Sequence, residues 1–201
     1  MTHPKGKREA SDERWRVFCA IELPAPTRLR LLSHIEKLQA LVSGVRASWS
    51  RESNVHLTLK FLGETPQQQV WKFDLAISRA VTGIRPFPIL ISGSGVFPGP
   101  RDPRVLWVGV SDPEGRLANL HSRIEAEAEQ ERFAREARSF HPHLTLARLR
   151  TREGAREIAR AHEELQFPPE EITVSEVLLI RSELSSKGSR YSTLSKHPLH
   201  A

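Results

Sequence analysis

Short apolar runs alternate with amphipathic stretches along most of the chain. Runs rich in β-branched and aromatic residues predict strands, and they cover 16–23, 54–62, 87–91, 104–110, 143–149, 172–180 and 190–195. Apolar residues at helical spacing predict helices, and these stretches cover about 27–42, 65–81, 113–131 and 152–164. Glycine and proline crowd the segment S-G-S-G-V-F-P-G-P-R-D-P at 92–103, which predicts a loop.

The order of these elements defines a fold class. Helices interleave with strands, but consecutive strands such as 87–91 and 104–110 interrupt the alternation, and S-S-K-G-S at 185–189 predicts a hairpin turn before the last strand. This order predicts an α+β protein with mainly antiparallel sheets, not a doubly wound one. Residues 1–14 are polar and charged, so we expect a disordered tail followed by a single domain over 15–201.

The sequence His-Leu-Thr-Leu occurs twice, at 56–59 and at 143–146, each time in a predicted strand. Because side chains alternate faces along a strand, each histidine shares a face with its threonine while the leucines point to the other side. The repetition suggests two similar halves that each contribute one copy. If the two strands are neighbours, two imidazoles and two hydroxyls face the same side.

Two histidines suit acid–base catalysis, because one can accept a proton while the other donates one. The threonine hydroxyls can donate hydrogen bonds to phosphate oxygens, where charge gathers in the transition state. The motif therefore points to phosphoester hydrolysis without a metal, with a strained cyclic phosphate as a natural target. A single histidine on a half-buried strand is usually structural, and it is the second copy that favours a functional site.

Composition and charge limit the classes of binding partner and the cellular location that we expect for the protein. The 201-residue chain has a formal net charge of +6, with 23 arginines and 7 lysines, which favours anionic partners or merely reflects an arginine-rich genome. The single cysteine, Cys19, excludes internal disulfides and multi-cysteine zinc sites. His141 and His143 lack a nearby carboxylate, so they form a poor zinc site. With no apolar run of ~18 residues and no secretory signal at the start, we expect a cytoplasmic protein without a membrane span.

Several longer segments support the functional interpretation of the repeated motif. They are R-V-F-C-A-I-E-L-P, W-S-R-E-S-N-V-H-L-T-L-K-F-L-G-E, G-V-F-P, P-R-V-L-W-V-G-V, F-H-P-H-L-T-L-A-R and R-S-E-L-S-S-K-G-S-R-Y. In order and spacing they resemble the 2H phosphoesterases, and more closely the RNA 2′,3′-cyclic phosphodiesterases, also called 2′-5′ RNA ligase-like proteins. The resemblance covers nearly the whole chain after the tail.

The resemblance implies a bilobal fold with pseudo-two-fold symmetry and a central cleft. It implies hydrolysis of RNA 2′,3′-cyclic phosphate ends to 2′-phosphomonoesters, in some members with reverse 2′-5′ joining of tRNA halves, and no metal or cofactor. By this resemblance His56 is the proton donor and His143 the proton acceptor, although the pseudo-symmetry allows the reverse, and Thr58, Thr145 and Arg148 bind the phosphate. Plain alternation puts Arg148 on the face opposite His143, so a bulge must reorient it.

Four further residues are candidates for the rim of the site. Phe18, Trp49 and Tyr191 can stack on a base or belong to the core, and Lys60 shares a face with His56 in a regular strand. The expected partner is an RNA with a cyclic phosphate end, without an obligate protein partner, for a monomeric protein. Two alternatives stay open: a non-catalytic module that binds RNA ends, and a phosphodiesterase of small cyclic nucleotides.

Overall fold

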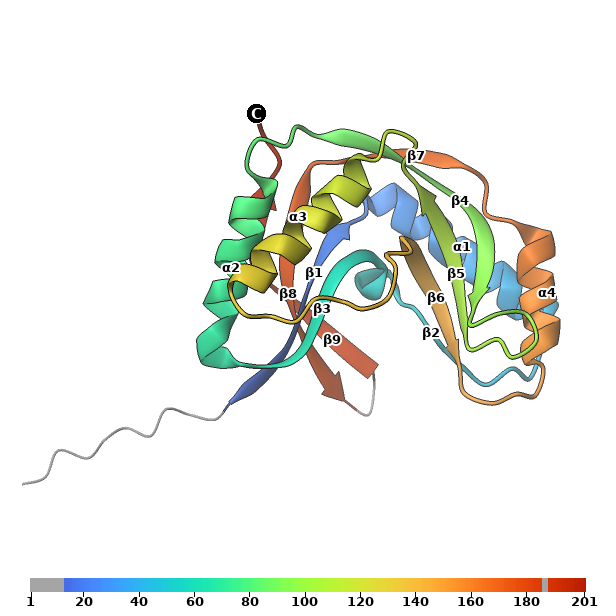
Figure 1. Cartoon of the computed structure of the whole chain (residues 1–201). Coiled ribbons are helices and arrows are strands. Elements are labelled where there is room, and N and C mark those ends of the chain that lie inside the picture. Colours follow the sequence, from blue (N-terminus) through green and yellow to red (C-terminus); the bar gives the residue numbers. More distant parts are fainter. Residues whose placement is uncertain (1–12, 186–187) are drawn as a thin grey trace, which may run out of the picture.

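The strands of the protein form two antiparallel sheets (Figure 1). The computed structural model describes residues 13–185 and 188–201. A four-stranded sheet has the order β3-β1-β8-β9, and a five-stranded sheet has the order β2-β6-β5-β4-β7. The strands are β1 (Arg14–Glu22), β2 (Ala47–Trp49), β3 (His56–Pro66), β4 (Phe87–Phe97), β5 (Val105–Ser111), β6 (His143–Leu149), β7 (Glu170–Val174), β8 (Glu176–Ser185) and β9 (Gly188–Pro198). The helices are α1 (Ala25–Leu41), η1 (Glu52–Asn54), α2 (Gln67–Val81), α3 (Arg116–Gln130) and α4 (Ala155–Leu165).

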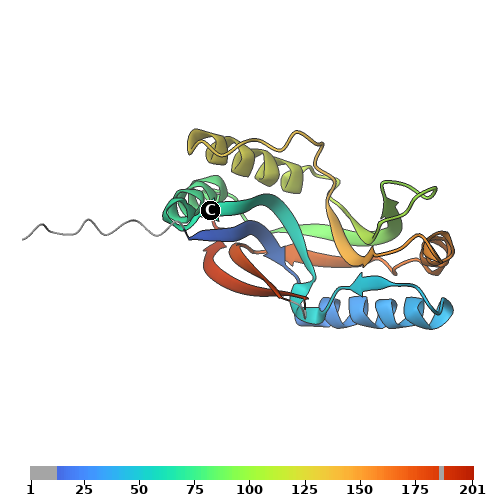
Figure 2. The same cartoon turned by 90° about the horizontal axis from the view of Figure 1, so that it is seen from below.

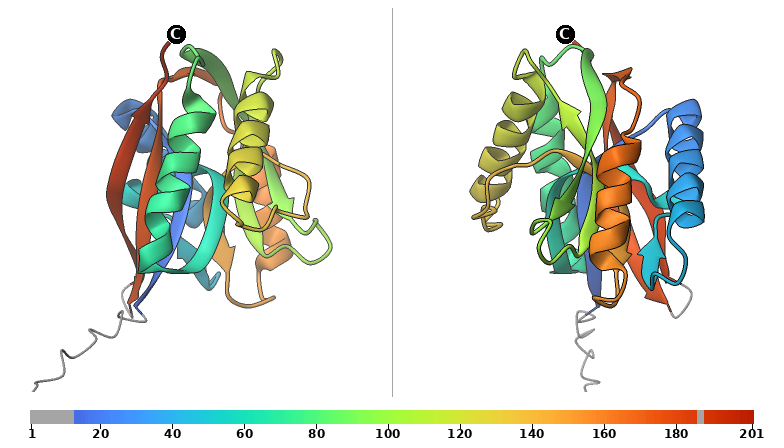
Figure 3. Two further views of the ribbon diagram at one scale, coloured as in Figure 1. Left: turned by 60° about the vertical axis from the view of Figure 1, so that its left-hand side comes forward. Right: turned by 90° about the vertical axis from the view of Figure 1, so that its right-hand side faces the viewer.

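Each sheet has its own pair of helices, which makes two lobes. Helices α2 and α3 pack against each other beside the four-stranded sheet, and α1 and α4 pack against each other beside the five-stranded sheet (Figure 3). Seen from below, the strands lie between α1 and α3 (Figure 2). The predicted α+β class with antiparallel sheets is confirmed. The lobes are not the two halves of the sequence, however, because β1 pairs with β8 and the chain passes between the sheets several times.

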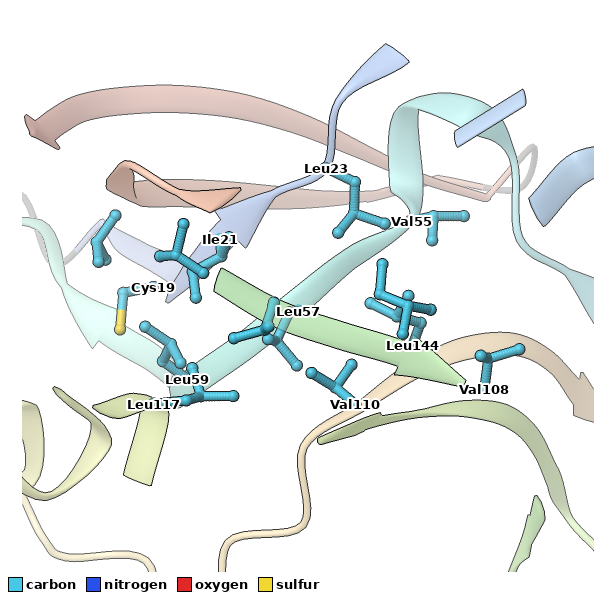
Figure 4. Packing of buried hydrophobic residues seen from close by; sticks show 14 of the residues in the cluster. Cys19, Ile21, Leu23, Val55, Leu57, Leu59, Val108, Val110, Leu117 and Leu144 are labelled. Carbon is cyan, nitrogen blue, oxygen red and sulfur yellow. The ribbon is translucent and has the colours of Figure 1, made fainter. Parts of the chain in front are cut away.

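One apolar core connects the two lobes, and the motif leucines are part of it. Leu57 and Leu144 have no exposed surface, and both belong to the same buried cluster (Figure 4). Full burial of such a side chain stabilises the fold by about 1.5–3 kcal/mol. Since alternate residues of a strand point to opposite sides, burial of the leucines turns the motif histidines and threonines away from this core.

The predicted loop at 92–103 is wrong over its first half, because β4 continues through Phe97. Gly93 adopts a positive φ of 73°, and the register with β5 shifts between Ser92 and Ser94. A glycine in this conformation allows a bulge, after which the strand resumes. Gly95 then leaves room for the indole of Trp107, since a Cβ atom there would lie 2.2 Å from the ring.

Other boundaries differ in smaller ways. The single strand predicted at 172–180 is two strands, since β7 pairs with β4 of one sheet and β8 pairs with β1 of the other. The sequence pattern missed the short strand β2. Most of the predicted tail at 1–14 lies outside the described residues, and Arg14 already belongs to β1. Two residues of the predicted hairpin turn, 186–187, also lie outside them, and the flanking strands β8 and β9 do pair.

Candidate active site

The two motif strands lie side by side, although they belong to different sheets (Figure 1). His56 and His143 are the first residues of β3 and β6, and both are partly exposed, as are Thr58 and Thr145. The intervening leucines are buried. We call the surface that carries these two histidines and two threonines the site face.

Each motif strand has a bulge at the same position, three residues after the histidine. In β3, Cys19 pairs with Lys60 and Ala20 with Thr58, so Leu59 is the extra residue. In β6, Leu106 pairs with Ala147 and Trp107 with Thr145, so the extra residue is the leucine between them. An extra residue reverses the alternation beyond it. Two consecutive residues are therefore buried in both strands.

The bulges decide which side chain follows each threonine on the site face. The residue five positions after the histidine is exposed in both strands: Arg148 in β6 and Phe61, 46% exposed, in β3. Arg148 thus shares a face with His143. The placement of Lys60 on the rim is wrong for the same reason, because the bulge turns Lys60 inward, where it is 4% exposed and paired with Glu125.

The ring of His143 is oriented by the backbone carbonyl two residues earlier. Nδ1 of His143 lies 2.6 Å from the carbonyl oxygen of His141. Since a carbonyl only accepts, Nδ1 carries the hydrogen, and in the neutral ring Nε2 keeps its lone pair. For His56, the backbone of Asn54, also two residues earlier, raises the pKa of the ring. The Asn54 side chain in turn donates to the Ser189 carbonyl at 3.0 Å.

The pKa values of both histidines are lowered. Burial lowers the pKa of His56 from 6.5 to about 4, against the Asn54 hydrogen bond, which raises it. Burial also lowers the pKa of His143, against the hydrogen bond to His141. The guanidinium of Arg148 lowers both pKa values further. One cation therefore lowers the pKa of both imidazoles, although burial is the larger cause for each.

Aromatic rings surround each histidine. The ring centroid of His56 lies 4.7 Å from that of Phe18, in a stacked arrangement, and 5.3 Å from that of Tyr191. Phe18 is 3% exposed and therefore supports the His56 ring from below rather than facing solvent. Phe61 continues the row, with its centroid 6.2 Å from that of Phe18. Trp49, the remaining stacking candidate, is on β2 and packs against the main core. It is not part of the aromatic row beside His56.

The His143 side has its own aromatic wall. The rings of Phe97 and Trp107 lie 5.0 Å and 6.3 Å from that of His143, and they also pack against His141. Sequence reasoning did not include Phe97 or Phe61 in the site. The signal that could have found Phe61 is its spacing, because it lies five positions after His56, as Arg148 lies five positions after His143.

Asp74, Ser195 and His197 resemble a nucleophilic triad but lack its geometry. Nε2 of His197 lies 2.9 Å from Oδ1 of Asp74 and 3.0 Å from Oγ of Ser195, and the Ser195 hydroxyl contacts the same Oδ1. A triad needs both ring nitrogens, one toward the carboxylate and one toward the hydroxyl. Here a single nitrogen faces both groups, so the three residues form a hydrogen-bonded link between α2 and β9.

Metal clusters, membrane-spanning helices and surface hollows were the other possible functional features of the described residues. Among them, no cluster of three or more histidine, cysteine, aspartate or glutamate residues is placed to hold a metal ion. None of their helices is long and apolar enough to cross a membrane. Two surface hollows, of about 350 Å³ between α1 and α4 and about 300 Å³ beside α3, contain no histidine.

An α+β protein whose two sheets each place an H-x-T-x strand on a common face is a 2H phosphoesterase. The chain belongs to the 2′-5′ RNA ligase superfamily, whose family model matches residues 27–185. An RNA 2′,3′-cyclic phosphodiesterase of Thermotoga maritima is 32% identical over 179 residues, which cover 89% of this chain and 92% of the relative. A protein of that name from Methanothermobacter thermautotrophicus is 32% identical over 182 residues, 89% and 96% of the two chains.

Solved structures agree with this assignment. TT0787 of Thermus thermophilus matches with a TM-score of 0.75 and 29% identity, over 92% of this chain and 97% of the other. Escherichia coli LigT in complex with 3′-AMP matches with a TM-score of 0.73 and 27% identity, over 94% and 100%. The resemblance seen in the sequence is therefore confirmed at the level of family and fold.

Proposed function

We propose that the protein hydrolyses RNA 2′,3′-cyclic phosphate ends to 2′-phosphomonoesters, with His56 and His143 as acid and base. The observation that carries the proposal is the contact between β3 and β6, which brings both histidines and both threonines to one side, with Arg148 exposed on the same strand as His143. The relatives named RNA 2′,3′-cyclic phosphodiesterase support the choice of substrate.

The proposed reaction is one in-line displacement at phosphorus. Nε2 of His143 takes a proton from water, and the water oxygen forms a bond to phosphorus. The bond between phosphorus and the 3′ oxygen breaks, and the 3′ oxygen takes a proton from His56. Thr58, Thr145 and Arg148 donate hydrogen bonds to the non-bridging oxygens, where negative charge increases.

The low pKa of His56 bears on its role as the acid. With a pKa of about 4, the ring is neutral near pH 7 in the free protein. A bound phosphodiester carries a negative charge, which opposes the effect of Arg148 and raises the pKa of both histidines. The proposal therefore requires His56 to gain its proton together with the substrate.

The aromatic row beside His56 offers a stacking surface for the base next to the cyclic phosphate. Tyr191 is partly exposed, and Phe61 has the larger exposed area of the two. Stacking on such rings is worth about 1–3 kcal/mol per base and tolerates different bases. A cytoplasmic location, a monomeric state, tRNA halves as substrate and reverse ligation belong to the same proposal, and each needs its own assay.

The test is hydrolysis of an RNA oligonucleotide with a 2′,3′-cyclic phosphate end, in the presence of a chelator. We expect His56→Ala and His143→Ala each to lower kcat by about 100- to 10,000-fold. His200→Ala is the matched control, because His200 is an exposed histidine whose ring bonds to the Pro198 carbonyl, away from the motif strands. Wild-type rates in both catalytic variants would reject the mechanism. RNA binding without turnover would favour a binding module, and faster turnover of 2′,3′-cyclic AMP would favour small substrates.

A further inference from the structure

Lys60 and Glu125 form a buried ion pair directly beneath the first motif strand. Each residue is 4% exposed, and Nζ of Lys60 lies 2.8 Å from both carboxylate oxygens of Glu125. The ammonium group makes a third hydrogen bond, to the carbonyl oxygen of Ala134 at 2.8 Å. All three donors of Lys60 are therefore used inside the protein.

The pair holds the segment that leads to the second motif. Oε2 of Glu125 accepts a hydrogen bond from the backbone N–H of Glu136 at 3.1 Å. Residues 134–136 thus have two backbone contacts to the pair, and they lie in the segment 131–142 between α3 and β6. Closer to β6, the ring of Phe140 stacks on His121 of α3, with centroids 3.9 Å apart and planes 8° apart.

This segment ends at the carbonyl that orients the His143 ring. The His141 carbonyl accepts from Nδ1 of His143, so its position decides which nitrogen is protonated and where Nε2 points. The two motifs differ here. Ala147 occupies in the second copy the position that Lys60 has in the first, and this buried side chain has no group that could hold a loop. The residue before the first motif is held differently, because the Asn54 side chain donates to the Ser189 carbonyl.

We propose that the Lys60–Glu125 pair is a positioning element for His143: it anchors residues 134–136 and thereby fixes the tautomer and the placement of the His143 ring relative to His56. The inference rests on the proposed function for its kinetic consequence. Two apolar side chains of similar size would fill the same space, but they cannot bind a carbonyl and an N–H.

The double variant Lys60→Met/Glu125→Met removes both charges and keeps an apolar, filled interior. We expect it to fold and to have a kcat about 10- to 100-fold below wild type, because a displacement of about 1 Å costs on that order. KM should stay within about two-fold, since phosphate-binding groups are unchanged. Arg123→Met is the matched control, because its guanidinium donates to the Thr82 carbonyl at 2.8 Å and so also joins α3 to a neighbour without touching the segment.

A second readout does not depend on activity. Nitrogen-15 NMR of the imidazoles should show His143 protonated at Nδ1 in the neutral wild-type ring, and a mixture of tautomers in the double variant. His121→Ala provides a second test that keeps both charges of the pair. It removes the ring stacked on Phe140 and its contact with Glu125 at 3.8 Å, and it should shift the tautomer in the same direction. Wild-type kcat and tautomer in the folded variants would overturn the positioning role. A wild-type protein without turnover would instead reject the proposed function, and the tautomer would still test the anchor.

Discussion

Replacement of Arg148 by methionine tests the organisation of the site most directly. Methionine keeps an unbranched side chain but has no charge and no donor. Arg148 is exposed, so the substitution should leave the core intact. Two consequences follow from the structure: the phosphate loses a charge-assisted contact, and both histidines lose a cation that lowers their pKa.

The size of the first effect follows from the kind of bond. A hydrogen bond to a charged group contributes about 1.5–3 kcal/mol. Because about 1.4 kcal/mol corresponds to a factor of ten, kcat/KM should fall by about 10- to 100-fold. For the second effect, burial stays the main cause of the low pKa values, so both should rise but remain below 6.5.

Loss of Arg148 also changes the pH dependence of activity. The base must be neutral to accept a proton, so activity is lost as the pH falls through its pKa. In Arg148→Met this pKa is higher, and the acid limb of the kcat/KM profile should move to higher pH. NMR titration of the imidazole Cε1–H signals measures the same two pKa values without substrate.

The matched control is Arg150→Met, two residues further along. Its guanidinium donates to the Ser48 hydroxyl at 2.8 Å, and Arg150 is not among the charges that lower either pKa. We expect it to leave both histidine pKa values and kcat/KM close to wild type. If Arg148→Met leaves both histidine pKa values unmoved, or matches Arg150→Met in kcat/KM, Arg148 does not join the two histidines in one site.

Two further predictions concern the surroundings of the site. Gly95→Ala should displace the Trp107 ring, because a Cβ atom would lie 2.2 Å from it, and it should destabilise the fold by about 1–3 kcal/mol. Thermal unfolding measures this loss. Gly99→Ala is the control, since nothing lies within 4 Å of a Cβ atom there, and it should show almost no change. Burial lowers the pKa of His34 to about 4, so below pH 6.5 the unfolded chain binds a proton that the folded protein excludes. At pH 5 this costs about 2 kcal/mol, and urea unfolding at pH 7.5 and pH 5 should show a smaller loss in His34→Gln than in wild type; an equal loss would mean that His34 titrates normally.

The sequence predicted most elements because their signals are local. Strand β6 begins and ends where the apolar run does, and α1 follows the leucine spacing within two residues at each end. The His-x-Thr-x repeat predicted that two histidines and two threonines lie on the solvent side of their strands. Side-chain alternation depends only on backbone geometry, so a short window of sequence is enough to infer it.

Assignments that depend on pairing between distant segments were missed or left open. The division of 172–180 into β7 and β8 depends on two different sheets, and the extension of β4 beyond Gly93 depends on its partner β5. A local pattern shows neither feature. The division depends on which strands pair with 172–180, and a bulge is defined by the strand opposite.

The repeated motif itself determined that this chain has two histidines with threonine neighbours, and hence the kind of chemistry to expect. Tertiary structure decided which other groups join them. A single extra residue in each strand turns Lys60 into the core and brings Phe61 and Arg148 to the surface beside the histidines. The reason is physical: alternation is a property of one strand, whereas its phase after a bulge is set by hydrogen bonds to a neighbour that is far away in the sequence.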